Sequence, residues 1–223
     1  MKGLCSMRVI FLGLPGAGKG TQAAAITEDF KIPHIATGDM FRAASAANTA
    51  LGEQVRKYLE SGLLVPDDVT ISVVKARLQQ ADAASGFLLD GFPRTKPQAQ
   101  TLDEILSELG RPVTQVLYLE VRRDELLRRL TGRRVCSGCG ASYHVVFNPP
   151  RLEGVCDRCG GPLTQRKDDQ PEAVAVRLKE NFERTQDLVK FYEGKGLLIR
   201  IDGEQPIGHV YDAIRQALRG ASV

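Results

Sequence analysis

Short apolar segments alternate with longer segments of mixed polarity along most of this sequence. The clearest apolar runs cover residues 7–13, 86–90, 114–121 and 197–202. Such runs are apolar on both faces, which is typical of strands buried inside a parallel sheet. The segments between and after them predict helices near residues 18–30, 67–83, 97–109, 122–131, 170–194 and 206–219. Strands that alternate with helices in this order predict an α/β fold built on a doubly wound parallel sheet.

Two stretches depart from this alternation. Residues 36–65 are rich in alanine and predict helix without a strong strand, whereas residues 132–169 are rich in glycine, proline and cysteine. The 223 residues, of which 43% are hydrophobic, suffice for one full core with insertions. We therefore predict a core made of residues 7–35, 66–131 and 170–223, with inserts at 36–65 and 132–169.

The composition narrows the class of protein. No apolar run approaches the roughly 20 residues that a membrane helix needs. Residues 1–12 lack a small-residue cleavage site, so we expect Met1–Ser6 to be a frayed leader and the protein to be cytoplasmic. The net charge of +3 is too small for a dedicated nucleic-acid binder. Arginines nevertheless cluster, which suits a small polyanion, at Arg122, Arg123, Arg128, Arg129, Arg133 and Arg134.

A glycine-rich segment separates the first predicted strand from the first predicted helix. Its sequence, GLPGAGKGT at residues 13–21, satisfies the phosphate-loop (P-loop) pattern G-x-x-x-x-G-K. Glycines let successive backbone N–H groups face phosphate oxygens, and the helix that follows presents the positive end of its dipole. Lys19 adds a point charge for the β- and γ-phosphates. The sequence therefore predicts an ATP-binding loop formed by Gly16, Ala17, Gly18, Lys19, Gly20 and Thr21.

The loop departs from the common pattern in one respect, because Gly20 stands between Lys19 and Thr21. In this form it resembles the loop of nucleoside monophosphate kinases, and no guanine-reading N-K-x-D motif occurs. Asp90 ends a predicted strand, where a carboxylate can hold Mg²⁺ through water. Four further motifs follow in collinear order, namely TGDMFR, LLDGFPRT, GRRV and QRKDDQ. From Met7 to about Leu218 the chain is thus similar to adenylate kinases of the bacterial long-lid type, which have a P-loop nucleoside triphosphate hydrolase-like fold.

This resemblance implies a reaction and the residues that serve it. The reaction is reversible phosphoryl transfer from ATP, bound with Mg²⁺, to AMP, catalysed by a monomer. Residues expected around the transferring group are Lys19, Arg129, Arg133, Arg166 and Arg177. Those expected at AMP are Thr37, Arg42, Leu63, Leu64, Val65, Gly91, Phe92, Pro93, Arg94, Gln98, Arg166 and Arg177, with Gln98 reading the adenine edge. Those expected at ATP outside the loop are Arg133, Ser142, Tyr143 and Gln205.

An acceptor that is itself a phosphate makes a general base unnecessary, so we interpret His34, His144 and His209 as structural. The chemistry instead requires that water be kept away from ATP, and closing lids are the usual means. We therefore expect the insert 36–65 to cover AMP and the insert 132–169 to cover ATP. Some relatives have a lysine at the position of Gln205, so we expect backbone contacts to the ATP adenine there.

Four of the five cysteines form two C-x-x-C pairs within the second insert, and Cys5 stands apart as an unpaired thiol. Cys136 and Cys139 are separated by sixteen residues from Cys156 and Cys159, which is the spacing of a four-thiolate zinc site. Four protein ligands leave no open position, so the zinc would be structural. Iron in place of zinc, redox disulfides and free thiols stay open as alternatives, and His144 could replace one cysteine.

Two other functions fit parts of the sequence. A related kinase could use UMP, CMP or GMP as acceptor, although the long second insert and Gln98 after DGFPRT favour AMP. A zinc-ribbon nucleic-acid binder with a P-loop switch belongs to a different class. It would leave the acceptor motifs unexplained, and the ribbon lacks the interleaved aromatic residues that single-strand binders use. Assaying each nucleoside monophosphate as acceptor separates these possibilities.

Overall fold

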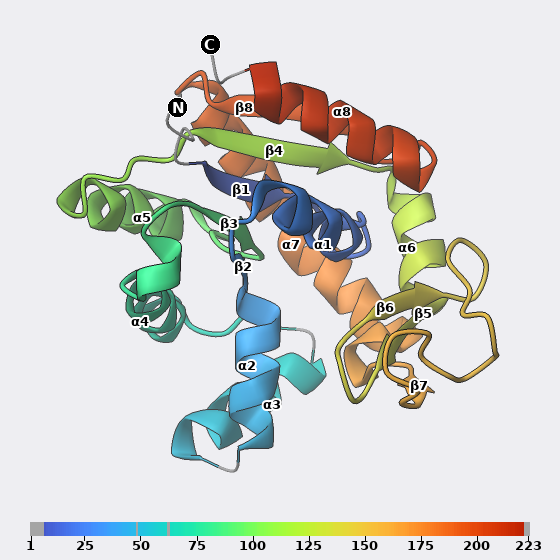
Figure 1. Cartoon of the computed structure of the whole chain (residues 1–223). Coiled ribbons are helices and arrows are strands. Elements are labelled where there is room, and N and C mark those ends of the chain that lie inside the picture. Colours follow the sequence, from blue (N-terminus) through green and yellow to red (C-terminus); the bar gives the residue numbers. More distant parts are fainter. Residues whose placement is uncertain (1–6, 48, 62, 221–223) are drawn as a thin grey trace.

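The computed structural model describes residues 7–47, 49–61 and 63–220 (Figure 1). Within these residues a five-stranded parallel sheet forms the centre, in the order β2-β3-β1-β4-β8. Its strands are β1 (Arg8–Leu12), β2 (His34–Ala36), β3 (Phe87–Asp90), β4 (Gln115–Glu120) and β8 (Leu198–Asp202). The parallel α/β fold predicted from the sequence is therefore confirmed. The leader and the unpaired thiol expected at Met1–Ser6 and Cys5 lie outside the described residues.

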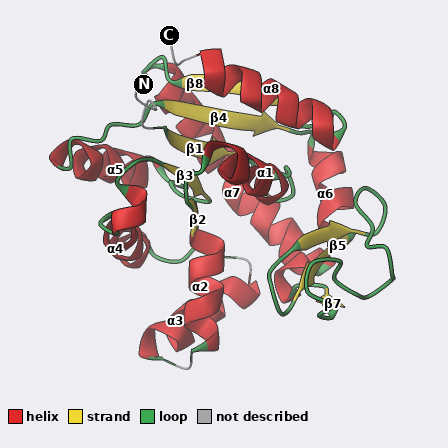
Figure 2. Ribbon diagram, viewed as in Figure 1, coloured by secondary structure: helices red, strands yellow, loops and turns green. Residues whose placement is uncertain are grey.

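Helices cover both faces of this sheet (Figure 2). Along β1, Val9 and Phe11 pack into one apolar cluster, while Ile10 and Leu12 pack into the other, because successive side chains of a strand point to opposite faces. This double burial explains why the strands read as continuous apolar runs. The core helices are α1 (Lys19–Phe30), α4 (Asp67–Leu78), α5 (Lys96–Glu108), α6 (Arg123–Thr131), α7 (Pro171–Glu193) and α8 (Ile207–Gly220).

Two local features differ from the pattern-based expectation. Strand β2 was not predicted, since it has only three residues and lies at the edge of the sheet, paired with β3. A segment this short carries too little hydrophobic periodicity to be recognised. The helix expected over 67–83 ends at Leu78 and is followed by a separate 3₁₀ turn, η1 (Ala81–Ala83).

The first insert forms two packed helices, α2 (Thr37–Ala46) and α3 (Ala50–Ser61), that extend from the end of β2 (Figure 1). It has a small apolar cluster separate from those of the sheet, formed by Phe41, Val55 and Val65. None of the described helices is both long and apolar enough to cross a membrane.

The second insert carries a small antiparallel sheet that the sequence pattern did not predict. Its strands are β5 (Arg133–Cys136), β6 (Ser142–His144) and β7 (Leu163–Thr164), in the order β6-β5-β7. The chain leaves the insert through a 3₁₀ turn, η2 (Lys167–Asp169), and enters α7. Two cysteines and Tyr143 form the buried centre of this insert, where a larger domain would have aliphatic residues.

Candidate active site

The glycine-rich loop connects β1 to α1 at the carboxyl edge of the sheet. Gly18 has a left-handed φ of 99°, and α1 begins at the next residue without a side-chain cap. The N–H groups of the first turn therefore remain available for an anion. Lys19 folds back over the loop, and its Nζ donates to the carbonyls of Gly13 (2.7 Å) and Leu14 (3.1 Å). This is the geometry of a preformed phosphate cradle.

Asp90 lies beside this loop because β3 is the neighbour of β1, with Phe11 in register with Asp90. Burial alone would raise the pKa of Asp90, but the hydrogen bond from His34 and the charge of Lys19 hold that pKa below its usual value. The carboxylate therefore stays ionised, which a magnesium site requires. His34 Nε2 is 3.3 Å from Asp90 Oδ2, a contact that sequence analysis missed because it depends on the unpredicted strand β2.

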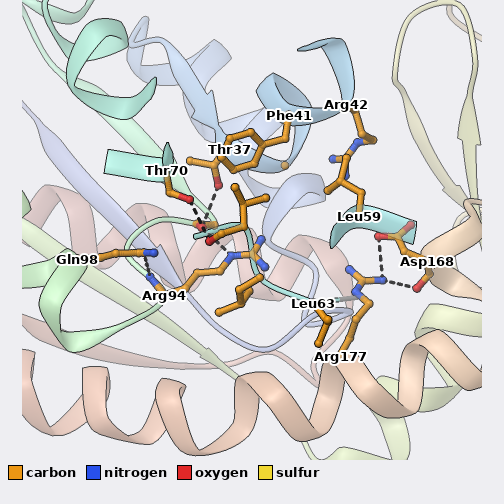
Figure 3. Close-up of a pocket in the computed structure, with 14 residues that line it drawn as sticks. Thr37, Phe41, Arg42, Leu59, Leu63, Thr70, Arg94, Gln98, Asp168 and Arg177 are labelled. Carbon is orange, nitrogen blue, oxygen red and sulfur yellow. Dashed lines mark hydrogen bonds and ion pairs between the residues drawn. The ribbon is translucent and has the colours of Figure 1, made fainter. Parts of the chain in front are cut away.

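A cleft of about 550 Å³, including its open mouth, lies between α2, α3, α4 and the connection from β3 to α5 (Figure 3). Residues predicted at AMP that line this cleft are Thr37, Arg42, Leu63, Leu64, Val65, Gly91, Arg94, Gln98 and Arg177. Lining residues that the sequence analysis missed are Gly38, Phe41, Leu59, Thr70 and Asp168; the first two stand inside the TGDMFR motif and could have been found there. Phe92 and Pro93 are buried and are not among the residues that line the cleft.

Positive charges crowd together between the loop and this cleft. Burial lowers the pKa of Lys19 from 10.5 to about 8, with nearby arginines contributing and Asp90 opposing. Burial and the charge of Arg177 lower the pKa of Arg94 to about 10. Burial and two neighbouring guanidinium groups likewise lower the pKa of Arg166 to about 10. Like charges lower one another's pKa because each disfavours the protonated form of the other, so the site is electrostatically complementary to a polyanion.

Asp169 joins the second insert to the core. Its carboxylate is fully buried and accepts two hydrogen bonds from Arg133, at 2.7 and 2.5 Å, and one from Arg177 at 2.9 Å. Arg133 is the first residue of β5, whereas Arg177 belongs to the core helix α7. Asp169 lies within the QRKDDQ motif but was not predicted as a site residue.

Arg129 does not join this group. Its Nε donates to Glu125, one helical turn earlier, at 2.7 Å, and its guanidinium donates to the Gly203 carbonyl at 2.8 Å. It therefore lies beside the loop that carries Gln205, and its expected place around the transferring group stays a prediction. The Gln205 side chain is exposed and donates to Asp202 at 2.7 Å.

Strand β6 carries two residues expected at ATP, Ser142 and Tyr143, and their surroundings differ. Ser142 is exposed, but Tyr143 is buried, and its hydroxyl lies 3.5 Å from Cys156 Sγ and accepts a hydrogen bond from the Asp157 N–H. The Tyr143 side chain therefore belongs to the cysteine cluster, and its expected contact with ATP stays a prediction.

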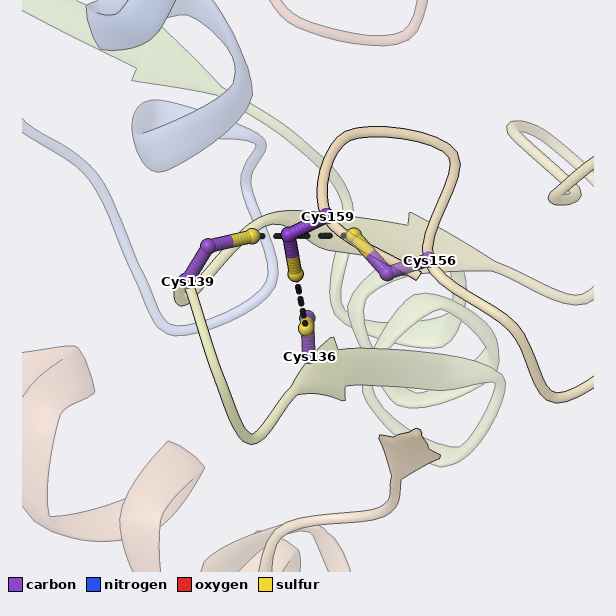
Figure 4. Close-up of side chains that lie close together, drawn as sticks. All are labelled: Cys136, Cys139, Cys156 and Cys159. Atoms are coloured by element: carbon purple, nitrogen blue, oxygen red, sulfur yellow. Dashed lines mark hydrogen bonds between the residues drawn. The ribbon is translucent and has the colours of Figure 1, made fainter. Parts of the chain in front are cut away.

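The four paired cysteines converge on one point (Figure 4). Their Sγ atoms all lie within 4.8 Å of one another, with Cys136 and Cys159 at 3.4 Å and Cys139 and Cys156 at 3.6 Å. A tetrahedral ion with Zn–S bonds of about 2.3 Å requires S···S separations of about 3.8 Å, so the cluster fits zinc. None of the four is in a disulfide.

Both cysteine pairs are followed by the same tight turn. Gly140 and Gly160 each have a φ of 73°, and their N–H groups donate to the carbonyls of Cys136 (3.0 Å) and Cys156 (2.8 Å). These left-handed turns explain why glycine is required after each cysteine pair.

A phosphate loop after the first strand of a parallel sheet, an acidic residue on the neighbouring strand and a positively charged cleft define the class of P-loop nucleotide phosphotransferases. The family model described as "Adenylate kinase" matches residues 11–197. Adenylate kinases of Bacillus licheniformis and of Geobacillus sp. (strain WCH70) are each 55% identical to this chain over 214 residues, covering 96% of it and 99% of the relative. That of Bacillus subtilis is 53% identical with the same coverage. The chain belongs to the adenylate kinase family.

Proposed function

We propose that this protein catalyses reversible phosphoryl transfer from ATP to AMP, which gives two ADP and maintains the balance of adenine nucleotides. The observation that carries the proposal is the crowding of Lys19, Arg94 and Arg177 between the P-loop and the cleft, where burial lowers the pKa of all three and the charge of Arg177 lowers the pKa of Lys19 and Arg94 further. Holding these cations together costs free energy in the absence of ligand. A pair of nucleotides that meet through their phosphates offsets that cost.

The chemistry needs positioning and charge neutralisation more than proton transfer. An oxygen of the AMP phosphate attacks the γ-phosphorus of ATP, and the bond from that phosphorus to the β–γ bridging oxygen breaks, with the electron pair leaving on ADP. The attacking phosphate is largely a dianion near neutral pH, so no base has to remove a proton. Lys19, Arg133, Arg166 and Arg177 surround the charge on the transferring group in this proposal.

AMP occupies the cleft in this proposal. Arg42 and Arg94 hold its phosphate, and Thr37, the backbone of residues 63–65 and Gln98 border its adenine. Residues 91–93 contribute to the AMP site by forming the connection that positions Arg94. Support comes from the lining of the cleft, where these arginines and apolar groups meet. Guanidinium forks match phosphate oxygens bidentately and remain charged at any working pH.

ATP binds at the P-loop with its adenine near the loop of Gln205 and Arg129. Asp90 holds Mg²⁺ through water, and the ion supplies neutralisation of phosphate charge when bound. The ionised state of Asp90 beside Lys19 supports this assignment.

The two inserts act as lids, residues 36–65 over AMP and residues 132–169 over ATP. In support, ion pairs connect them next to the cleft, from Lys167 to Glu60 at 2.8 Å and from Arg166 to Asp39 at 3.9 Å. Closure of both lids excludes water as a competing acceptor.

The cysteine cluster holds one structural zinc ion. Four thiolates saturate a tetrahedral ion, so no metal-bound water is available for chemistry, and the zinc instead orders the second insert. We further propose a cytoplasmic monomer whose partners are ATP, AMP and ADP, without nucleic acid or membrane. The small net charge of +3 supports the absence of a nucleic-acid partner.

A coupled assay of ADP formation with ATP and each of AMP, CMP, UMP and GMP tests the acceptor. We expect the highest kcat/KM with AMP. A higher value for any other nucleoside monophosphate would show that the acceptor assignment is wrong.

A further inference from the structure

The Gln98 side chain is held at both ends of its amide. Its Nε2 donates to Asp67 Oδ1 at 2.7 Å, and its Oε1 accepts from the backbone N–H of Arg94 at 2.7 Å. The second oxygen of Asp67 accepts from the Thr95 hydroxyl at 2.8 Å. The oxygen of that hydroxyl in turn accepts from the backbone N–H of Gln98 at 3.2 Å. Gln98 is 1% exposed yet lines the cleft (Figure 3).

The Asp67 carboxylate and the Arg94 backbone N–H together permit only one orientation of the Gln98 amide. A carboxylate such as Asp67 only accepts hydrogen bonds, and the Arg94 N–H only donates. If the amide were rotated by 180°, its oxygen would face the carboxylate and its NH₂ group would face another donor. Both contacts would then be repulsive, so Asp67 and the Arg94 backbone together fix which end of the amide is oxygen and which is nitrogen.

A fixed amide can distinguish 6-amino from 6-oxo purines. After the two protein contacts, Gln98 has one N–H and one oxygen lone pair left. The Watson–Crick edge of adenine offers a donor at the 6-amino group and an acceptor at N1, which such an amide pairs bidentately. Hypoxanthine and guanine reverse this order, with an acceptor at O6 and a donor at N1. A rotated Gln98 would therefore pair with a 6-oxo purine at the same place.

We propose that Asp67 determines the preference of the acceptor site for 6-amino over 6-oxo purines, acting through the orientation of Gln98. This inference rests on the proposed function, which places the acceptor base against Gln98. Asp67 is a positioning residue, because it acts on the base only through Gln98. Without its carboxylate, the Arg94 N–H alone would hold the amide, and rotation would no longer bring oxygen against a negative charge.

The test compares AMP with inosine 5′-monophosphate (IMP), whose base differs from adenine only by its 6-oxo edge. The kcat/KM for each acceptor is measured at saturating ATP for the parent, Asp67→Ala, Asp67→Leu, Gln98→Leu and the matched control Asp68→Ala. Asp68 lies in the same first turn of α4 and is exposed. Asp67→Leu keeps the approximate shape of the side chain without any acceptor, so it decides the outcome if Asp67→Ala does not fold.

We expect both Asp67 variants to lower the AMP-to-IMP ratio of kcat/KM by about tenfold or more, the scale of one bidentate base contact. The KM for ATP and the ratio in Asp68→Ala should stay at parent values, which a general structural defect would not produce. Gln98→Leu could strongly lower the AMP-to-IMP ratio of kcat/KM while both Asp67 variants keep a ratio within about threefold of the parent. In that case the role proposed for Asp67 is wrong. If Gln98→Leu itself leaves the ratio unchanged, Gln98 does not read the base, and both this inference and that part of the proposed function fail.

Discussion

The buried carboxylate of Asp169 offers a direct test of how the second insert is attached to the core. It is fully buried and accepts three hydrogen bonds, two from Arg133 and one from Arg177. The side chains of these arginines are 20% and 13% exposed, so water screens the pairs little. Replacing Asp169 by Asn keeps the size of the side chain but removes its charge and turns an NH₂ group toward arginine donors.

The expected loss follows from these contacts. Removing one partner of a buried ion pair lowers the free energy of unfolding by about 3–5 kcal/mol. Because both arginines keep some exposure, we expect a loss at the lower end of this range, about 3 kcal/mol. For a chain of this size, each kcal/mol lowers the melting temperature by about 2–4 °C, so Asp169→Asn should lower it by about 6–12 °C.

Thermal unfolding followed by circular dichroism, with denaturant titration as a second measurement, checks this value. Asp212→Asn, on the exposed side of α8, serves as the control and should stay within about 0.5 kcal/mol of the parent. A loss below about 1 kcal/mol in Asp169→Asn, with the control unchanged, would refute the view that Asp169 holds the two arginines together.

Three further outcomes are expected. Lys19→Met should fold normally but lose several kcal/mol of transition-state stabilisation, about 100-fold or more in kcat; turnover within about tenfold of the parent would contradict the role of Lys19. With a pKa of about 8, Lys19 has lost half of its charge at pH 8 and most of it by about pH 9, so kcat/KM for ATP should fall above about pH 8. A pH profile that is flat to pH 10, or equal to that of Lys19→Arg, would oppose this. The double variant Cys156→Ser, Cys159→Ser should have a lower melting temperature, with little change in its affinity for AMP. Metal analysis of the parent should give one zinc per chain. A metal-free protein of full stability and activity would refute the zinc assignment.

Several features of this protein are determined by short stretches of its sequence. The P-loop depends on glycines and a lysine that are neighbours in the chain, so its conformation follows from local backbone freedom and the start of a helix. The same holds for each cysteine pair, whose turn is completed by the next glycine. The apolar runs likewise predict buried parallel strands, because strands covered on both faces need apolar residues at every position.

Other features required the tertiary structure because their partners are far apart in the chain or depend on side-chain direction. Strand β2 is too short for periodicity to reveal, yet it brings His34 to Asp90. Arg129 is drawn toward Glu125 and Gly203, although its sequence context resembled that of the other active-site arginines.

The contacts that decide orientation lie beyond any local pattern. Asp67 meets Gln98 across 31 positions, and Asp169 meets Arg133 across 36, so neither pair belongs to one motif. Hydrogen bonds of this kind form only after packing has fixed the elements that carry both partners, because their geometry tolerates errors of only a few tenths of an ångström. The sequence therefore determined which chemical groups the site contains, and tertiary packing determined how those groups face one another.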